Sequence, residues 1–292
     1  MAYRLKPGKE TVESGIRRIA GEEFARITDI LANPDLAAAR QVHEVRKSTK
    51  RLRSMLRLIA PVFGEAQSEN AILRDAARSL SSARDTGAVL DSLGRLKLSA
   101  EARPTIEAAL TVPPAFPSNK NGSAKLLKAF GREIRGAEKR ATKWTIEQEN
   151  FDAVLPGLSR SYKRLRADAS VAVGSGQEEA THEWRKSAKC HWHHTLLLGE
   201  ICPDAMEAHA RMAGRLSESL GNWRDSGLLI AALDALPPDQ LDKDLVKSVR
   251  RAALRDQKRL IKKAERITRL LTAEKPKALT SRWAAYWAAS EA

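Results

Sequence analysis

Hydrophobic residues recur every three or four positions along almost the whole chain, and runs that alternate at every second position are scarce. This spacing places apolar side chains on one face of an α-helix, so it predicts an all-α protein. In the first half, the pattern predicts helices near 10–32, 36–61, 65–98 and 123–149. In the second half, it predicts helices near 151–172, 177–200, 204–236 and 238–273.

Helix-breaking residues separate these segments. The longest predicted loop lies between the third and fourth helices, and it contains Pro113, Pro114, Pro117, Asn121 and Gly122. Beyond residue 273, the aromatic residues Trp283, Tyr286 and Trp287 predict a short helix that docks through its rings.

The two halves of the sequence resemble each other. Residues 43–50 read HEVRKSTK and residues 182–189 read HEWRKSAK, identical at six of eight positions at an offset of 182 − 43 = 139. A second match, at an offset of 140, pairs Leu80, Arg84, Asp85, Gly87 and Leu93 with Leu220, Arg224, Asp225, Gly227 and Leu233. Two matches in the same order predict two tandem four-helix bundles related by an internal repeat with pseudo-twofold symmetry. The expected units are a first bundle at 1–150, a second bundle at 151–273 and a C-terminal tail at 274–292.

Charge indicates the class of partner. The 292 residues contain 51 Lys and Arg against 36 Asp and Glu, a net charge of +15. Such a protein is expected to meet an anion, namely nucleic acid, polyphosphate or an acidic membrane surface. A basic but merely solvated surface is the alternative.

The second predicted helix arranges its cations in one line. His43, Arg46, Lys50, Arg53 and Arg57 are spaced by three and four residues and fall within roughly 80° of one helix face. Like charges at this spacing repel each other, so folding stability does not favour the arrangement. A bound polyanion that neutralises the line explains it, and a solvated face is the alternative.

The fourth predicted helix of each half carries a similar line. In the first half the line consists of Lys125, Lys128, Arg132, Arg135, Lys139 and Lys143. In the second half it consists of Arg255, Arg259, Lys262, Arg266 and Arg269, and Asp256 and Glu265 interrupt it. If the second and fourth helices are neighbours in each bundle, their lines wall one groove in which a chain of phosphates fits.

Other chemistry is weakly supported. A carboxylate recurs beside an arginine in two places, Arg84-Asp85 and Arg224-Asp225. Each carboxylate either orients a cation of the line or hydrogen-bonds to the local backbone.

Three further histidines, His191, His193 and His194, are interpreted as packing or exposed residues. We expect no metal site and no cofactor, because the Cys and His spacings match no metal motif. The sequence has no Gly-rich phosphate loop and no paired catalytic carboxylates, so no enzymatic activity is expected.

Targeting signals are also missing. No apolar run approaches the ~20 residues that span a bilayer, and the N-terminus lacks the apolar core of a signal peptide. Cys190 and Cys202 are the only cysteines and fit reduced thiols, although a disulfide is not excluded. A cytoplasmic protein is therefore expected.

The motifs resemble those of the CHAD domain family, the conserved histidine α-helical domains. The resemblance rests on His-x-x-Arg-x-x-x-Lys-x-x-Arg at His43–Arg53, on its second copy from His182 to Lys189, and on Leu-Gly-x-x-Arg-Asp at Leu220–Asp225. It implies two tandem four-helix bundles that bind inorganic polyphosphate along a basic central groove and localise to polyphosphate granules. His43, Arg46, Lys50 and Arg53 match the first motif, and His182, Arg185 and Lys189 match the second, whereas Trp192 stands where the first copy has Arg53.

The hypothesis is thus non-catalytic binding of inorganic polyphosphate. Nucleic-acid binding is the first alternative and a phosphate-processing enzyme the second, and the oligomeric state stays open. The predicted polyphosphate-binding residues are His43, Arg46, Lys47, Lys50, Arg53, Arg57, Lys128, Arg132, Arg135, Lys139, His182, Arg185, Lys186, Lys189, Arg255, Arg259, Lys262 and Arg266.

Overall fold

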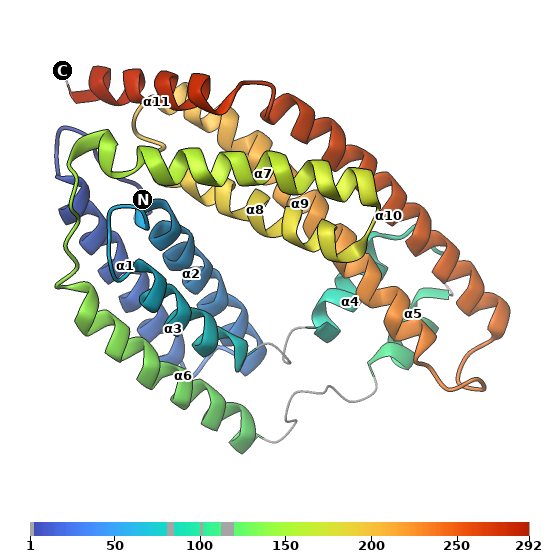
Figure 1. Cartoon of the computed structure of the whole chain (residues 1–292). Helices are drawn as coiled ribbons and strands as arrows, with labels where there is room; N and C mark the ends of the chain where they lie inside the picture. The colour runs from blue at the N-terminus through green and yellow to red at the C-terminus, as the bar shows by residue number, and fades with distance from the viewer. Residues whose placement is uncertain (1–2, 81–84, 100–101, 112–119, 292) are drawn as a thin grey trace.

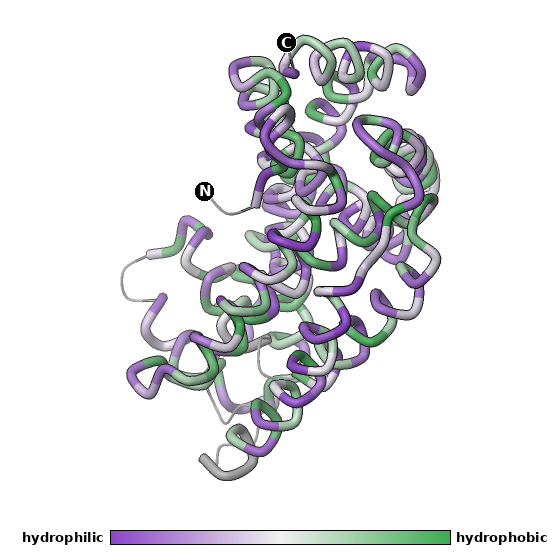
Figure 2. Tube along the Cα trace, turned by 90° about the vertical axis from the view of Figure 1, so that its left-hand side faces the viewer, coloured by the Kyte–Doolittle hydropathy of each residue, from purple (hydrophilic) through white to green (hydrophobic). Residues whose placement is uncertain are grey.

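The computed structural model describes residues 3–80, 85–99, 102–111 and 120–291. These residues form eleven α-helices and a short 3₁₀ helix (η2, Asn150–Ala153), with no strand among them. The all-α prediction is confirmed. Hydrophobic and hydrophilic residues alternate along the helices, as expected for helices that bury one face (Figure 2).

Four helices of the first half form a bundle. They are α1 (Val12–Ala32), α2 (Ala38–Ile59), α3 (Ala66–Arg78) and α6 (Lys120–Ala141). Helices α1 and α3 each pack against both α2 and α6, so α2 and α6 lie diagonally across the bundle (Figure 1). The Thr11 hydroxyl caps α1 by accepting a hydrogen bond from the Ser14 amide at 3.1 Å.

Four long helices of the second half form another bundle. They are α7 (Leu155–Ser175), α8 (Glu178–Leu197), α9 (Pro203–Asp234) and α10 (Lys243–Leu271). Helix α7 packs against α8, α8 against α9, and α9 against α10. The Asp242 carboxylate caps α10 by accepting hydrogen bonds from the backbone amides of Asp244 and Leu245.

The prediction of one helix over 65–98 is wrong. Helix α3 ends at Arg78, residues 79–80 form a turn, and a separate helix α4 (Asp85–Arg95) follows. A short helix α5 (Ala102–Leu110), inside a segment expected to be a loop, packs on α4. The apolar face of α4 lies on α9 of the other half, where Val89 and Leu93 share a buried cluster with Leu229 and Leu233. A helix that buries its apolar face on a different bundle cannot continue straight from α3.

Helix α6 begins at Lys120 and ends at Ala141, earlier at both ends than the predicted 123–149. The predicted loop residues Pro113, Pro114 and Pro117 lie outside the described residues, as does Arg84 of the Arg84-Asp85 pair.

One apolar core joins the first bundle to the second half. Phe24, Leu52 and Phe130 of the first bundle belong to the same buried cluster as Leu158 of α7 and Leu197 of α8. The C-terminal helix α11 (Pro276–Glu291) docks on this cluster through Trp283 and Trp287, both buried, which confirms the predicted aromatic docking. The partition into a first and a second unit, and the internal repeat, stay predictions. None of the described helices is long and apolar enough to cross a bilayer.

Candidate anion-binding groove

The first bundle meets the second half where α2 crosses α7 and α8. His193 and His194 of α8 are buried at this crossing, and both contact Ser54 of α2. The Ser54 hydroxyl lies 2.9 Å from His193 Nδ1, and its carbonyl oxygen lies 2.8 Å from His194 Nε2. These histidines therefore pack and hydrogen-bond inside the protein, one of the two roles that the sequence left open for them.

Gly157 lets α7 approach α2 closely. A Cβ atom on Gly157 would lie only 1.7 Å from the Leu58 carbonyl oxygen, so only glycine fits this position. The close crossing brings the next turn of α7, with Arg160 and Arg164, to the C-terminal end of α2, where the cationic line ends at Arg57.

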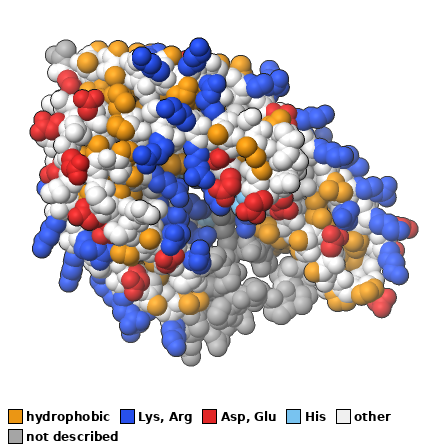
Figure 3. Space-filling view, viewed as in Figure 1, with side chains coloured by type: hydrophobic (Ala, Val, Ile, Leu, Met, Phe, Trp, Pro, Cys, Tyr) orange, Lys and Arg blue, Asp and Glu red, His pale blue; other side chains and the backbone are white. Residues whose placement is uncertain are grey.

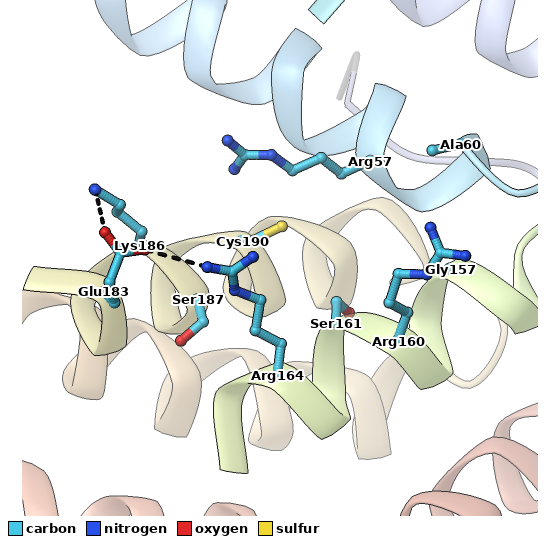
Figure 4. Close-up of a pocket in the computed structure, with 10 residues that line it drawn as sticks. All are labelled: Arg57, Ala60, Gly157, Arg160, Ser161, Arg164, Glu183, Lys186, Ser187 and Cys190. Atoms are coloured by element: carbon cyan, nitrogen blue, oxygen red, sulfur yellow. Dashed lines mark hydrogen bonds and ion pairs between the residues drawn. The ribbon is translucent and has the colours of Figure 1, made fainter. Parts of the chain in front are cut away.

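Four cations from three helices surround a pocket at this crossing. Arg57 of α2, Arg160 and Arg164 of α7, and Lys186 of α8 line a hollow of about 260 Å³ (Figure 4). Among the described residues, Glu183 is the single carboxylate that lines it. Glu183 is engaged already, because its Oε1 lies 2.5 Å from Lys186 Nζ and its Oε2 lies 3.2 Å from Arg164 Nη2.

A second hollow continues the pocket towards α3. Arg57 and Arg160 line both hollows, and the second, of about 350 Å³, also includes Asn70 of α3. Beside it, the Arg53 Nε donates a hydrogen bond to Asn70 Oδ1 at 3.0 Å. Burial, together with the neighbouring charges of Arg57 and Arg74, lowers the pKa of Arg53 to about 10. A guanidinium that is crowded by cations is stabilised by a bound anion.

Further cations lie near His182 on α8 and α9. Burial lowers the pKa of His182, and the charges of Arg185, Arg224 and Lys186 add to this effect. Burial is the larger of the two causes. Arg224 lies 3.4 Å from Asp225, so the second of the two predicted Arg-Asp pairs is an ion pair.

Figure 3 shows Lys and Arg side chains along one margin of a central hollow, and acidic side chains on the margin where α8 begins. We call the hollow, with the two pockets at its α7 end, the central groove.

Of the predicted residues of α2 and α8, Arg57 and Lys186 line the first pocket and Arg53 contacts Asn70 beside the second, whereas some others have structural partners. Arg46 donates a hydrogen bond to the Ala77 carbonyl at 2.6 Å and so caps the end of α3. Lys189 lies over the Trp192 ring, 4.0 Å from its centre, and Trp192 in turn packs against Gly214 of α9. His43, Lys47, Arg57 and Lys186 are exposed, and Lys50 and Arg185 are half-buried.

The lines on α6 and α10 lie elsewhere. A shared groove required the second and fourth helices of a bundle to be neighbours. In the first bundle they are not neighbours, because α2 and α6 lie diagonally across it. The residues concerned are all exposed on outer faces: Lys128, Arg132, Arg135 and Lys139 on α6, and Arg255, Arg259, Lys262 and Arg266 on α10.

No metal site accompanies the groove. In the part of the chain that the structure describes, no cluster of three His, Cys, Asp or Glu side chains is arranged to hold a metal ion.

The comparison with known families agrees with the fold. The sequence model of the CHAD domain matches residues 24–234, which is most of the chain. The chain belongs to the CHAD domain family. A crystal structure of the CHAD domain from the plant Ricinus communis superposes with a TM-score of 0.67, covering 92% of this chain and 94% of that chain at 15% sequence identity. No curated protein matches the sequence.

Sequence reasoning missed two groove cations of this CHAD chain, Arg160 and Arg164 on α7. With Lys163 they form only a short cationic run, so their charge alone gave no signal. The available signal was Pro156-Gly157 just before them, because a glycine in the first turn of a helix marks a close helix crossing.

Proposed function

We propose that this chain binds inorganic polyphosphate without catalysis in the central groove. One observation carries the proposal: Arg57, Arg160, Arg164 and Lys186 converge from three helices on one pocket whose single lining carboxylate among the described residues is already paired. This excess positive charge favours an anionic ligand, and guanidinium forks match the tetrahedral oxygens of phosphate.

The shape of the groove favours a thin polymer. The two hollows share Arg57 and Arg160, so successive phosphates of one chain can contact cations of α8, α7 and α2 along a continuous path. A flexible chain of single phosphates can enter such a path, whereas a rigid duplex is too wide. The resemblance of the His43 and His182 motifs to those of the CHAD family implied the same ligand.

The non-catalytic part of the proposal rests on the groove chemistry. Glu183 is held by Lys186 and Arg164, so it lacks the freedom of a general base or of a metal ligand. Hydrogen bonding by Lys186 lowers the pKa of Glu183, which keeps it ionised and unsuited to act as an acid. We therefore expect no release of orthophosphate and no shortening of polyphosphate by the purified protein, with or without Mg²⁺ or Mn²⁺.

A titration with polyphosphates of defined lengths tests the binding proposal. Arg57→Glu and Arg160→Glu should each weaken binding by about tenfold or more, since each removes a charge-assisted contact and adds repulsion. The control Lys243→Glu makes the same charge change at an exposed position at the start of α10. Affinity should rise with chain length until the polymer spans the groove. Equal losses in all three variants would show that only bulk charge acts, and reproducible turnover would overturn the non-catalytic part.

Targeting to polyphosphate granules follows as the cellular consequence. A fluorescent fusion of the wild-type chain should concentrate on granules in cells that accumulate polyphosphate, and the Arg57→Glu fusion should spread evenly. A wild-type fusion that stays diffuse in such cells argues against this role while leaving binding itself to the titration.

A further inference from the structure

Helix α10 carries a cationic line that has no place in the central groove. Seven cations lie within roughly 100° of its outer face and extend over about 27 Å at 1.5 Å per residue. We call this line the α10 ridge, and it consists of Arg251, Arg255, Lys258, Arg259, Lys262, Arg266 and Arg269, all exposed. Figure 3 shows Lys and Arg side chains following this edge of the molecule, where Figure 1 places α10.

Acidic residues do not neutralise the ridge. Between residues 251 and 269 the sequence has only Asp256 and Glu265. Asp256 is buried and pairs with Arg259 at 2.6 Å, and Glu265 faces α7 across a hollow between the helices. Glu265 lies within one turn of Lys262 and Arg269, whereas the remaining cations of the ridge lie three or four residues from like charges. Folding disfavours such like-charge spacing, and a bound polyanion relieves it.

We propose that the α10 ridge is a second polyanion-binding surface that docks the phosphate backbone of a nucleic-acid duplex without reading its sequence. A duplex is straight and stiff, so it loses little conformational freedom when it lies along a straight ridge. At ~3.4 Å per base pair the ridge matches about eight base pairs. The ridge consists of Arg and Lys on one open helix face, whose summed charge favours contacts with the phosphates along the outside of a duplex.

Two other polyanions fit the ridge less well. A membrane-surface helix needs an apolar face for the lipid, but Leu260, Ala264 and Leu271 of α10 are buried against the protein. Leu270 is exposed, and one such side chain does not make an apolar face. A flexible polyphosphate chain would have to be straightened on an open ridge, which costs conformational entropy. An enclosing groove offsets this cost with contacts on several sides of the chain, whereas the ridge offers cations on one side only.

The test compares three variants by fluorescence anisotropy with two 30-base-pair DNA duplexes of unrelated sequence. The ridge variant is Arg255→Ala, Lys262→Ala and Arg266→Ala. The control variant, Lys9→Ala, Arg26→Ala and Lys97→Ala, removes the same charge from exposed positions outside the ridge and the groove. The groove variant is Arg57→Ala with Arg160→Ala. Polyphosphate and anionic vesicles are titrated in parallel.

The ridge variant should bind both duplexes at least tenfold more weakly than wild type, and the groove variant should bind them within about twofold of wild type. The dependence of log K on log salt should flatten by about 0.9 for each lost phosphate contact, or about 2.7 for three. Polyphosphate binding should fall in the groove variant only, so this proposal and that of the groove can fail separately.

Three results would overturn the ridge proposal. An equal loss in the ridge and control variants would mean that net charge alone attracts the duplex. A loss of duplex binding in the groove variant alone would place the duplex at the groove. Vesicle binding that requires the ridge, with duplex binding unchanged, would assign the surface to membranes.

Discussion

Gly157 of α7 lies directly against the backbone of Leu58 of α2, so close that a Cβ atom would fall 1.7 Å from the Leu58 carbonyl oxygen. The contact fixes how the second half of the chain sits on the first. It also sets the position of Arg160 opposite Arg57, and with it the geometry of the proposed polyphosphate site.

Gly157→Ala should therefore destabilise the protein and damage the groove together. We expect a loss of about 3 kcal/mol in the free energy of unfolding, because the backbone of Leu58 has to move to admit the methyl group. The matched control is Gly174→Ala in the same helix, where a Cβ meets nothing within 4 Å. That change should be neutral or stabilise by about 0.5–1 kcal/mol. Denaturant unfolding of both variants measures the difference, and similar effects would contradict the role of the contact.

Removing the paired carboxylate should strengthen polyanion binding. Glu183→Gln removes the ion pairs of Glu183 with Lys186 and Arg164 and raises the net charge of the pocket by one, while Arg164 keeps its ion pair with Asp168. We expect polyphosphate affinity to rise about threefold to tenfold, the range given by one charge near a screened site. Isothermal titration at fixed salt measures it. The exposed Glu207→Gln, which breaks an ion pair with Arg211 on α9, is the control and should have little effect. A fall in affinity with Glu183→Gln would show that Glu183 orients the cations instead of competing for them.

The buried histidines should make the protein less stable in acid. Burial lowers the pKa of His209 to about 4, helped by the charge of Arg282 and opposed by that of Glu274. Its Nε2 lies 2.9 Å from Nε2 of His191, whose pKa burial also lowers strongly. The folded state keeps both rings neutral, whereas the unfolded chain takes up protons below its ordinary pKa near 6.5.

Stability should therefore fall as the pH decreases from about 6.5 towards 4, by about 1.4 kcal/mol per pH unit for each such histidine. His209→Gln should reduce the slope of the unfolding free energy against pH by the contribution of one histidine. This holds even if the substitution changes the stability at neutral pH. Urea unfolding at several pH values gives the slope. A slope that is unchanged in His209→Gln would mean that His209 titrates normally in the folded protein.

The C-terminal helix should contribute to the stability of the whole fold. Trp283 of α11 is fully buried, and its ring centre lies 5.2 Å from that of His209 and 6.2 Å from that of His191. Trp283→Ala should cost about 3–5 kcal/mol, the usual range for a large aromatic residue in a core. Tyr286→Ala, at a half-buried position of the same helix, should cost clearly less. Two separate unfolding transitions in Trp283→Ala would show that α11 stabilises only its own half.

The sequence by itself determined the helical class, most helix positions and the aromatic docking of α11, because these follow from the periodic spacing of apolar residues along one helix. It also determined that Arg53 and Arg57 share one helix face.

Only the tertiary structure decided which helix faces meet. The split of the predicted helix 65–98 depends on α4 burying Val89 and Leu93 against α9, a contact between residues more than a hundred positions apart. The convergence of Arg57 with Arg160, and the outward position of the lines on α6 and α10, depend likewise on helix packing. Periodicity fixes the direction of a side chain relative to its own helix axis, but the neighbour it faces is set by how the bundles assemble.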